Sequence, residues 1–285
     1  MYCLNGRVAL VTGVGGEHGI GHAVAVRLAA DGADVVITDI VENPYSDHPS
    51  EWGGLGSVIR EITGLGRRSI SILADISNAH EVDSMVDEAV GYFGHVDILV
   101  HCAGSLPGSD RRLVVDLDEE SWDRVFDVNA KGAFLNCRAV SRHMIKRGQG
   151  GKIVIVASAS GKRPLPNQAA YNASKAASLM LTKTLAIELS HHNINVNAIN
   201  PGAVDTDRTG YIEAALANEE HGGSPETWWS SEERRKFLNT HADTIPLGRV
   251  ATSLDIANSA AFLVSSESDY LTGITIDVSG GSLLS

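Results

Sequence analysis

Cysteine is scarce in this chain of 285 residues, and no pattern in the sequence pairs it. Cys3, Cys102 and Cys137 are scattered, and no C-x-x-C motif occurs. Disulfide frameworks and zinc sites need clustered cysteines, so we expect reduced thiols, as in a cytoplasmic protein. The 11 histidines include no pair with ligand spacing in a supporting context, and we expect no metal site.

Positive charge is also in short supply. The 23 Lys and Arg residues are outnumbered by 35 Asp and Glu residues, which gives a net charge of −12. A nucleic-acid or membrane partner is therefore not expected. No apolar run approaches the ~18 residues that span a bilayer. A strand-like run begins by Arg7 and leaves no room for a signal peptide, so we expect a cytoplasmic location.

Aromatic residues are few, at 5%, whereas 29 residues are glycine, as suits a fold with many tight strand–helix turns. Runs rich in Val and Ile alternate with helical patterns. The predicted strands are 8–12, 34–39, 68–74, 96–101, 152–157, 194–199 and 274–278. The predicted helices are 20–31, 54–65, 78–93, 119–147, 168–190 and 253–264. Because the strands are continuously apolar, we expect an α/β fold: a Rossmann-type doubly wound parallel sheet of about seven strands, with helices on both faces, in a single domain over residues 1–285.

A glycine-rich turn follows the first predicted strand and precedes the first predicted helix. It runs Thr12-Gly13-Val-Gly-Gly-Glu-His-Gly19-Ile20-Gly21. Such a turn lets the backbone approach a pyrophosphate, which then lies at the positive end of the helix. A plain strand–helix connector is the alternative, because the turn does not fit G-x-G-x-x-G.

Asp39 ends the second predicted strand, eighteen residues after Gly21. A carboxylate at this place accepts hydrogen bonds from the ribose hydroxyls of an adenine dinucleotide and repels a 2′-phosphate. No Lys or Arg follows at Ile40, so charge favours NAD over NADP. A turn residue at the end of a strand is the alternative role for Asp39.

Polar signals also follow other strands, at Asp75, Gly104, Ser158 and Gly202. Ligands of open parallel sheets bind beyond the carboxyl ends of the strands, so these signals should gather at one edge.

Tyr171 and Lys175 are four residues apart in a predicted helix and therefore share one face. A phenol titrates near ~10, and a neighbouring cation lowers that pKa. Ser158 could hydrogen-bond the same substrate oxygen. Together the three residues predict a proton-transfer site for an alcohol or a ketone.

The chain resembles the classical short-chain dehydrogenase/reductase (SDR) family over essentially its whole length. The resemblance is carried by these residues in this order: Thr12-Gly13, Gly19-Ile20-Gly21, Asp75, Ala103-Gly104, Asn129, Ser158, Tyr171-x-x-x-Lys175, Pro201-Gly202, Pro246–Arg249 and Asp277–Gly281.

The resemblance implies a role for each catalytic position. Tyr171 would be the acid–base residue in hydride transfer at nicotinamide C4. Lys175 would lower the pKa of Tyr171 and hold the nicotinamide ribose. Ser158 would orient the substrate oxygen, and Asn129 would support a proton-relay water.

The resemblance also implies a cofactor site. Thr206 would bind the nicotinamide carboxamide. The other expected cofactor-binding residues are Gly13, Gly19, Ile20, Gly21, Asp39, Asp75, Ile76, Ala103, Gly104, Tyr171, Lys175, Pro201, Gly202 and Val204.

Two features depart from the family pattern. Five residues, 14–18, separate Thr-Gly from Gly-x-Gly where the family usually has three, so we expect a longer phosphate loop. An insertion at 41–54 follows Asp39, beside the expected adenosine pocket. We interpret it as a plain surface excursion. The alternative is a resemblance to the insertion of actinobacterial members that hold NAD tightly and pass electrons to a separate carrier.

The stretch 203–245 is irregular, and the family places a substrate lid there. Tyr211, Trp228 and Trp229 would form an apolar wall or pack a lid helix or subunit contact. The charged run 232–236 is interpreted as a solvated helix face. Arg163 and Gln168 could border the pocket.

The sequence leaves three functions to be weighed against one another. An NAD-dependent dehydrogenase or reductase of small secondary alcohols and ketones is favoured. An epimerase or dehydratase of the extended branch would need a larger C-terminal domain than the residues after Pro201 supply. A non-catalytic dinucleotide-sensing regulator would be expected to lose Tyr171 or Lys175, and both are present. The resemblance further implies a homotetramer.

Overall fold

The computed structural model describes residues 2–44, 52–210 and 232–284. Its centre is a parallel sheet of seven strands in the order β3-β2-β1-β4-β5-β6-β7. The strands are β1 (Val8–Thr12), β2 (Asp34–Asp39), β3 (Ser69–Leu73), β4 (Ile98–His101), β5 (Gly151–Val156), β6 (Ile194–Pro201) and β7 (Thr275–Val278). The prediction of a doubly wound parallel sheet is confirmed.

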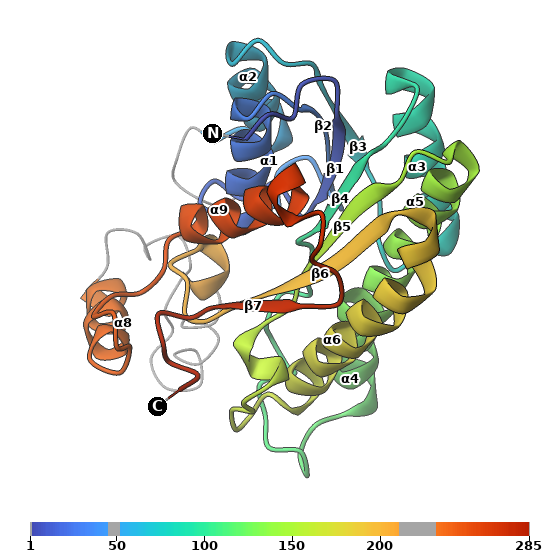
Figure 1. Ribbon diagram of the computed structural model, residues 1–285. Helices are drawn as coiled ribbons and strands as arrows, with labels where there is room; N and C mark the ends of the chain where they lie inside the picture. Colours follow the sequence, from blue (N-terminus) through green and yellow to red (C-terminus); the bar gives the residue numbers. More distant parts are fainter. Residues whose placement is uncertain (1, 45–51, 211–231, 285) are drawn as a thin grey trace.

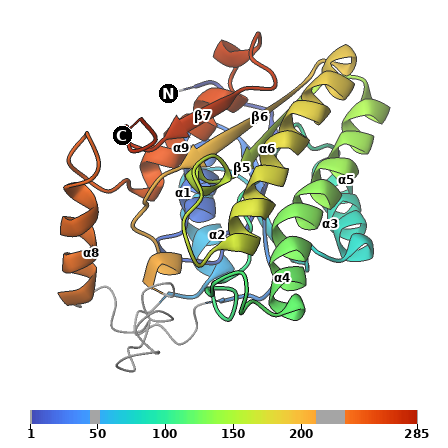
Figure 2. The same cartoon turned by 90° about the horizontal axis from the view of Figure 1, so that it is seen from below.

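Helices cover both faces of the sheet. The α-helices are α1 (Ile20–Ala30), α2 (Leu55–Gly64), α3 (Ala79–Phe93), α4 (Glu119–Phe126), α5 (Gly132–Arg147), α6 (Ala169–Leu189), α8 (Glu232–Ala242) and α9 (Ser253–Val264). Figure 2 shows α1, α2 and α9 on one face and α3, α4, α5 and α6 on the other. Each face closes over its own hydrophobic cluster, so every central strand is buried on both sides.

The long helix predicted over 119–147 is interrupted. A π-helical segment, η1 (Asp127–Lys131), lies between α4 and α5. Short π segments insert an extra residue into a helix and are frequent at functional sites. The buried Asn129 sits within this one.

The sheet directs its carboxyl ends to one side of the molecule. In Figure 1 these ends face the side that carries α8 and the start of α6. β1 and β4 are neighbours in the sheet, and the chain leaves them toward opposite faces. A crevice is expected at such a switch point. Within the described ranges, no helix is long and apolar enough to cross a membrane.

Candidate active site

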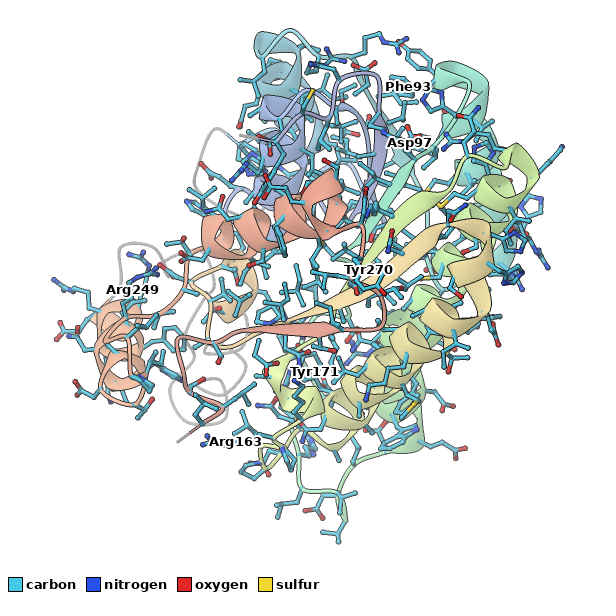
Figure 3. The ribbon with its side chains drawn as sticks, viewed as in Figure 1. Phe93, Asp97, Arg163, Tyr171, Arg249 and Tyr270 are labelled. Carbon is cyan, nitrogen blue, oxygen red and sulfur yellow. The ribbon has the colours of Figure 1, made fainter. Side chains whose placement is uncertain are left out.

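Tyr171 lies in the first turn of α6, with Ser158 at the end of β5 and Lys175 one turn further along the helix. Ser158 and Tyr171 are joined by a side-chain hydrogen bond. The Lys175 Nζ lies 5.8 Å from the centre of the Tyr171 ring and donates to the Val156 carbonyl at 3.0 Å. Figure 3 shows Tyr171 near the start of α6. The three residues predicted to act together are therefore brought together.

The electrostatic surroundings favour the phenolate of Tyr171. Burial raises the pKa of Tyr171, but the charges of Lys175, Arg208 and Arg111 and the hydrogen bond from Ser158 outweigh it, so the pKa is lowered overall. Burial and the neighbouring Arg208 lower the pKa of Lys175 against the opposing pull of Tyr171. A phenol whose pKa moves toward neutrality can take up and release a proton more readily.

Asn129 is fixed by hydrogen bonds on both sides of its amide. Its Oδ1 accepts from the Ser105 N–H at 2.9 Å, and its Nδ2 donates to the Ser174 hydroxyl at 3.0 Å. Its backbone carbonyl accepts from the Ser178 hydroxyl at 3.4 Å. The side chain therefore ties the π segment to α6 and to the loop after β4. Its part in a proton relay stays a prediction.

The glycine turn brings two segments of backbone into close contact. A Cβ on Gly13 would lie 2.6 Å from the Ala103 Cα, and one on Gly21 would overlap the Gly13 carbonyl oxygen. No side chain of the described residues caps α1, and its first turn carries no acid. Gly19 precedes this uncapped turn, and Ile20 begins it. Such a cradle suits a dinucleotide pyrophosphate.

Asp39 faces this turn from the end of β2. Its carboxylate accepts from the Gly15 N–H at 2.9 Å and from the Ile40 N–H at 2.8 Å. Burial raises the pKa of Asp39, and the backbone N–H groups of Gly15, Ile40 and Val14 oppose that rise. The position predicted for the ribose therefore holds an acid that also shapes the turn.

The insertion at 41–54 packs on the glycine turn through the residues that the structure describes. The Trp52 indole donates to the Gly15 carbonyl at 2.7 Å. A Cβ on Gly15 would overlap the Pro44 ring. The Trp52 ring also lies against His22, with centroids 4.9 Å apart. The insertion is thus part of the turn's support and not merely a surface excursion.

An open pocket of about 680 Å³ lies beside Ile40 and Asp75, away from Tyr171. Its charged lining is mostly acidic: Asp75, Glu119, Glu120, Asp123 and Asp127, with Arg124 as the cation among its lining residues. Asp75 accepts from the Ser77 N–H at 2.9 Å, and Ile76 packs beneath Gly132 of α5. This is the side on which the adenine was predicted.

Gly104 follows the central strand β4, and the predicted residues after β6 lie further along the same edge of the sheet. A Cβ on Gly104 would lie 3.2 Å from the Asn129 Oδ1 and 3.9 Å from the Lys175 Nζ.

Pro201 ends β6, and a Cβ on Gly202 would lie 3.0 Å from the Ser279 Cα. Val204 forms a bridge with Ala251. The Thr206 hydroxyl is 3.1 Å from that of Thr209. The roles of these four residues toward a cofactor stay predictions.

The predicted lid is described only in part. Tyr211, Trp228 and Trp229 lie outside the described residues. The Arg234 Nε donates to Asp205 at 3.2 Å, so the charged run is not purely a solvated face as predicted. The ion pair docks α8 on the segment after β6.

Arg163, predicted as a possible pocket border, donates to the Ser282 carbonyl at 2.8 Å. Figure 3 shows Arg163 near the C-terminal end of the chain. Gln168 is the residue that precedes α6.

Two features of the site have no signal in the sequence. Arg111 and Arg208 lie 5.0 Å and 5.2 Å from the centre of the Tyr171 ring, measured from the guanidinium carbon. His18, in the lengthened turn, binds Asp207 through its backbone N–H at 2.8 Å and its Nδ1 at 3.2 Å. All four residues fall in stretches without periodicity, and the sequence carries no signal for their pairing.

Two groups beside the site, the buried His101 and the partly buried Cys102, are held in their neutral forms. Burial lowers the pKa of His101 to about 3 and raises the pKa of the Cys102 thiol to about 12. The Thr12 hydroxyl is 3.2 Å from the His101 Nδ1 and accepts from the Ala103 N–H at 3.1 Å. All three cysteines are free thiols. Within the described ranges, no group of three or more metal-ligating side chains is arranged to hold an ion.

Fold and site together are those of an oxidoreductase of the SDR type. The family model described as enoyl-(acyl carrier protein) reductase matches residues 13–282. The chain belongs to the short-chain dehydrogenase/reductase family.

Relatives with assigned substrates cover nearly the whole chain. This chain is 38% identical to 2-dehydro-3-deoxy-D-gluconate 5-dehydrogenase of Dickeya dadantii, over 98% of its own length and 96% of that protein. It is 35% identical to galactitol 2-dehydrogenase of Agrobacterium fabrum, over 99% of each chain. The crystal structure of carveol dehydrogenase from Mycobacterium avium in complex with NAD superposes with a TM-score of 0.85 at 29% identity, covering 100% of both chains.

Proposed function

We propose that this protein is an NAD(H)-dependent oxidoreductase that interconverts a secondary alcohol and a ketone, with Tyr171 as the acid and base. The observation that carries the proposal is the arrangement of Tyr171 between the Ser158 hydroxyl and the Lys175 ammonium, which lowers the pKa of the phenol overall. A bound nicotinamide supplies or accepts the hydride.

The chain's own residues handle the proton. In the oxidation direction, the Tyr171 phenolate takes the proton from the alcohol oxygen while Ser158 holds that oxygen in place. In the reduction direction, the phenol returns the proton to the developing alkoxide. Lys175 stabilises the phenolate, and its bond to the Val156 carbonyl holds the ammonium at the end of β5.

The residues present fit a dinucleotide. Gly13 and Gly21 let the turn fold tightly against Ala103 and on itself, and the start of α1 that follows has no side-chain cap and could receive a pyrophosphate. Asp39 and the acidic pocket beside Asp75 support a preference for NAD, because a 2′-phosphate there would meet several carboxylates.

We further propose a single domain over residues 1–285, with 203–245 as the substrate lid, in a cytoplasmic homotetramer. Exposed apolar side chains on α5 and α6 support the assembly: Phe134, Met180 and Ile187 are 44%, 61% and 77% exposed. Light scattering that gave a monomer mass would remove this part of the proposal.

The relatives act by name on different compounds, so the identity of the alcohol is not transferred from them.

The test is a screen of secondary alcohols and ketones, followed by NADH absorbance, with NAD and NADP compared for each. We expect turnover with NAD and a much lower kcat/KM with NADP. Tyr171→Phe keeps the ring but loses the acid–base group, so kcat should fall by roughly 100- to 10,000-fold. The dissociation constant of NADH should change little.

Three outcomes would count against the proposal. Turnover retained in Tyr171→Phe would remove the proposed role of the tyrosine. Comparable kcat/KM with the two cofactors would overturn the preference for NAD. Binding of NADH without turnover of any compound would favour the dinucleotide-sensing regulator instead.

A further inference from the structure

Two guanidinium groups from distant parts of the chain meet at the catalytic tyrosine. Arg111 comes from the loop between β4 and α4, and Arg208 from the segment after β6. Their guanidinium carbons lie 5.0 Å and 5.2 Å from the centre of the Tyr171 ring. Their charges lie close to that of Lys175, in a protein whose net charge is −12. Like charges repel, so a cluster of three cations favours the binding of an anion.

Arg111 is buried without enough partners. It is 8% exposed, and among the described residues neither its Nε nor its Nη1 has a hydrogen-bond partner. The nearest anion is Asp110, whose Oδ2 lies 3.4 Å from the Arg111 Nε. The other oxygen of Asp110 accepts from Arg124 at 3.1 Å and from the Gly108 N–H at 2.9 Å. One carboxylate is therefore shared between two arginines.

Arg208 is anchored at one end and open at the other. Its Nη1 donates to the Ser105 carbonyl, and the Ser105 N–H donates to Asn129 at 2.9 Å. Its Nη2 is buried and has no hydrogen-bond partner within the described ranges. The loop that Asn129 holds thus also fixes the position of Arg208.

The free N–H groups are not required by the tyrosine itself. The Tyr171 side chain has its own hydrogen bond with Ser158. Buried N–H groups are normally partnered, because leaving them unpaired is unfavourable. A guanidinium presents a planar fork that matches a carboxylate. A ligand carboxylate at this place would satisfy N–H groups on both arginines.

We propose that Arg111 and Arg208 form a subsite for a carboxylate of the substrate, so that the reacting alcohol or ketone is a hydroxy acid or an oxo acid. This inference rests on the proposed function, because it describes what the same site selects. A phosphate monoester would use the same fork, and the test separates the two anions.

The test compares pairs of compounds in which one member carries an anionic group where the other carries a neutral one. D-Gluconate and D-glucitol form one pair, and 3-hydroxybutanoate and 3-hydroxybutanamide form another. We expect kcat/KM with NAD to favour each acid over its neutral partner by roughly 10- to 100-fold. Glycerol 3-phosphate against glycerol is the phosphate arm. A larger preference in that arm would overturn the assignment to a carboxylate.

Variants test which residues create the preference. Arg111→Gln and Arg208→Gln should bring the acid-to-neutral ratio close to one, whereas Arg111→Lys should retain part of it. Arg112→Gln removes the same charge from an exposed neighbour and should leave the ratio unchanged. A variant that lost activity equally on both members of a pair would overturn the proposal, because a role in folding or in the pKa of Tyr171 predicts that result.

Binding decides the subsite separately from turnover. Calorimetry uses the Tyr171→Phe enzyme with NADH bound, and D-gluconate and D-glucitol as probes. We expect at least roughly 10-fold tighter binding of gluconate, lost when Arg111→Gln is added. Equal binding of the two probes would overturn the subsite. Absence of NAD-linked turnover in every pair and throughout the wider screen would overturn the proposed function, and the calorimetric result would still stand.

Discussion

The glycine turn and the region around Tyr171, here called the reaction end, lie at the same edge of the sheet. Their backbone and side-chain groups are satisfied in opposite ways. At the turn, the Gly15 N–H donates to Asp39 and the Gly15 carbonyl accepts from Trp52, so the backbone is held by the protein itself. At the reaction end, Arg111 and Arg208 keep buried N–H groups that have no partner in the described part of the chain.

This contrast separates two functions within one site. A turn that is already held loses little conformational freedom when a dinucleotide binds, which favours affinity. A cluster with unpaired donors rewards the ligand that completes it and penalises one that cannot, which favours discrimination. In the proposed function, the turn would therefore favour tight binding of the cofactor, and the arginine cluster would favour selection of the substrate.

Lys175→Met has the largest expected effect, because it removes the ammonium charge beside Tyr171. Lys175 is the strongest of the charges that oppose burial and lower the pKa of Tyr171. Without it that pKa rises, so alcohol oxidation at neutral pH should fall by roughly 100-fold or more. Part of the rate should return as the pH rises and the phenolate forms.

The measurement is the pH dependence of kcat/KM for the wild type and the variant. Lys162→Met is the control, because Lys162 is paired with Asp277 at 2.8 Å and not with Tyr171. Its profile should match that of the wild type. A Lys175→Met profile with an unshifted midpoint would contradict the role given to this charge.

Trp52→Phe tests the support of the glycine turn, and we expect a smaller effect than for Lys175→Met. The substitution removes the indole N–H that bonds Gly15 and keeps an aromatic ring against His22. One lost hydrogen bond of about 1 kcal/mol should weaken NADH binding by roughly 5-fold, with kcat nearly unchanged. Fluorescence titration of NADH measures the dissociation constant.

Trp122→Phe is the matched control for this experiment. Trp122 stacks on Phe126 in α4, with ring centroids 4.8 Å apart, and has no bond to the glycine turn. An unchanged dissociation constant in Trp52→Phe would mean that the insertion does not support the turn for binding.

His18→Gln gives the smallest effect and probes the link between the turn and the segment after β6. The hydrogen bond and charge of Asp207 raise the pKa of His18 above its ordinary 6.5 against the effect of burial. The pair therefore stabilises the fold fully below pH 6.5, and this contribution is lost as the pH rises through the raised value. Because His18 is partly exposed, screening limits the contribution to about 0.5 kcal/mol.

Thermal unfolding at about pH 5.5 and about pH 9 measures this contribution. The variant should lose about 1–2 °C relative to the wild type at the lower pH and less at the higher. His80→Gln is the control, because His80 lies exposed on α3. A deficit that grew with pH would contradict the assigned sign.

Much of the fold follows from the apolar runs. The strands Val8–Thr12 and Asp34–Asp39 are predicted at both ends, because buried parallel strands are continuous in Val and Ile and end at polar residues. The break at Asp127–Lys131 is not predicted. It depends on Asn129 meeting Ser105 and Ser174, contacts between segments that only the folded chain brings together.

The candidate site, like the fold, could be predicted from the sequence only where its residues are close together in the chain. The spacing of Tyr171 and Lys175 on one helix is local, so the sequence reveals it. Arg111 lies in a loop, and Arg208 lies in a stretch whose sequence shows no clear period, so no pattern indicates where their side chains point. Arg163 was a reasonable candidate by position, but its bond to Ser282 directs it to the end of the chain.

The π segment also sets the helical phase of everything that follows it in α5. An α-helix advances by about 100° per residue, so removing one residue from Asp127–Lys131 would rotate α5 by that angle if α4 continued into it. Leu135 and Val140, now buried against the sheet, would turn away from it. The number of residues in this segment is therefore as constrained as their identity, and α5 can face the core only while the extra residue is kept.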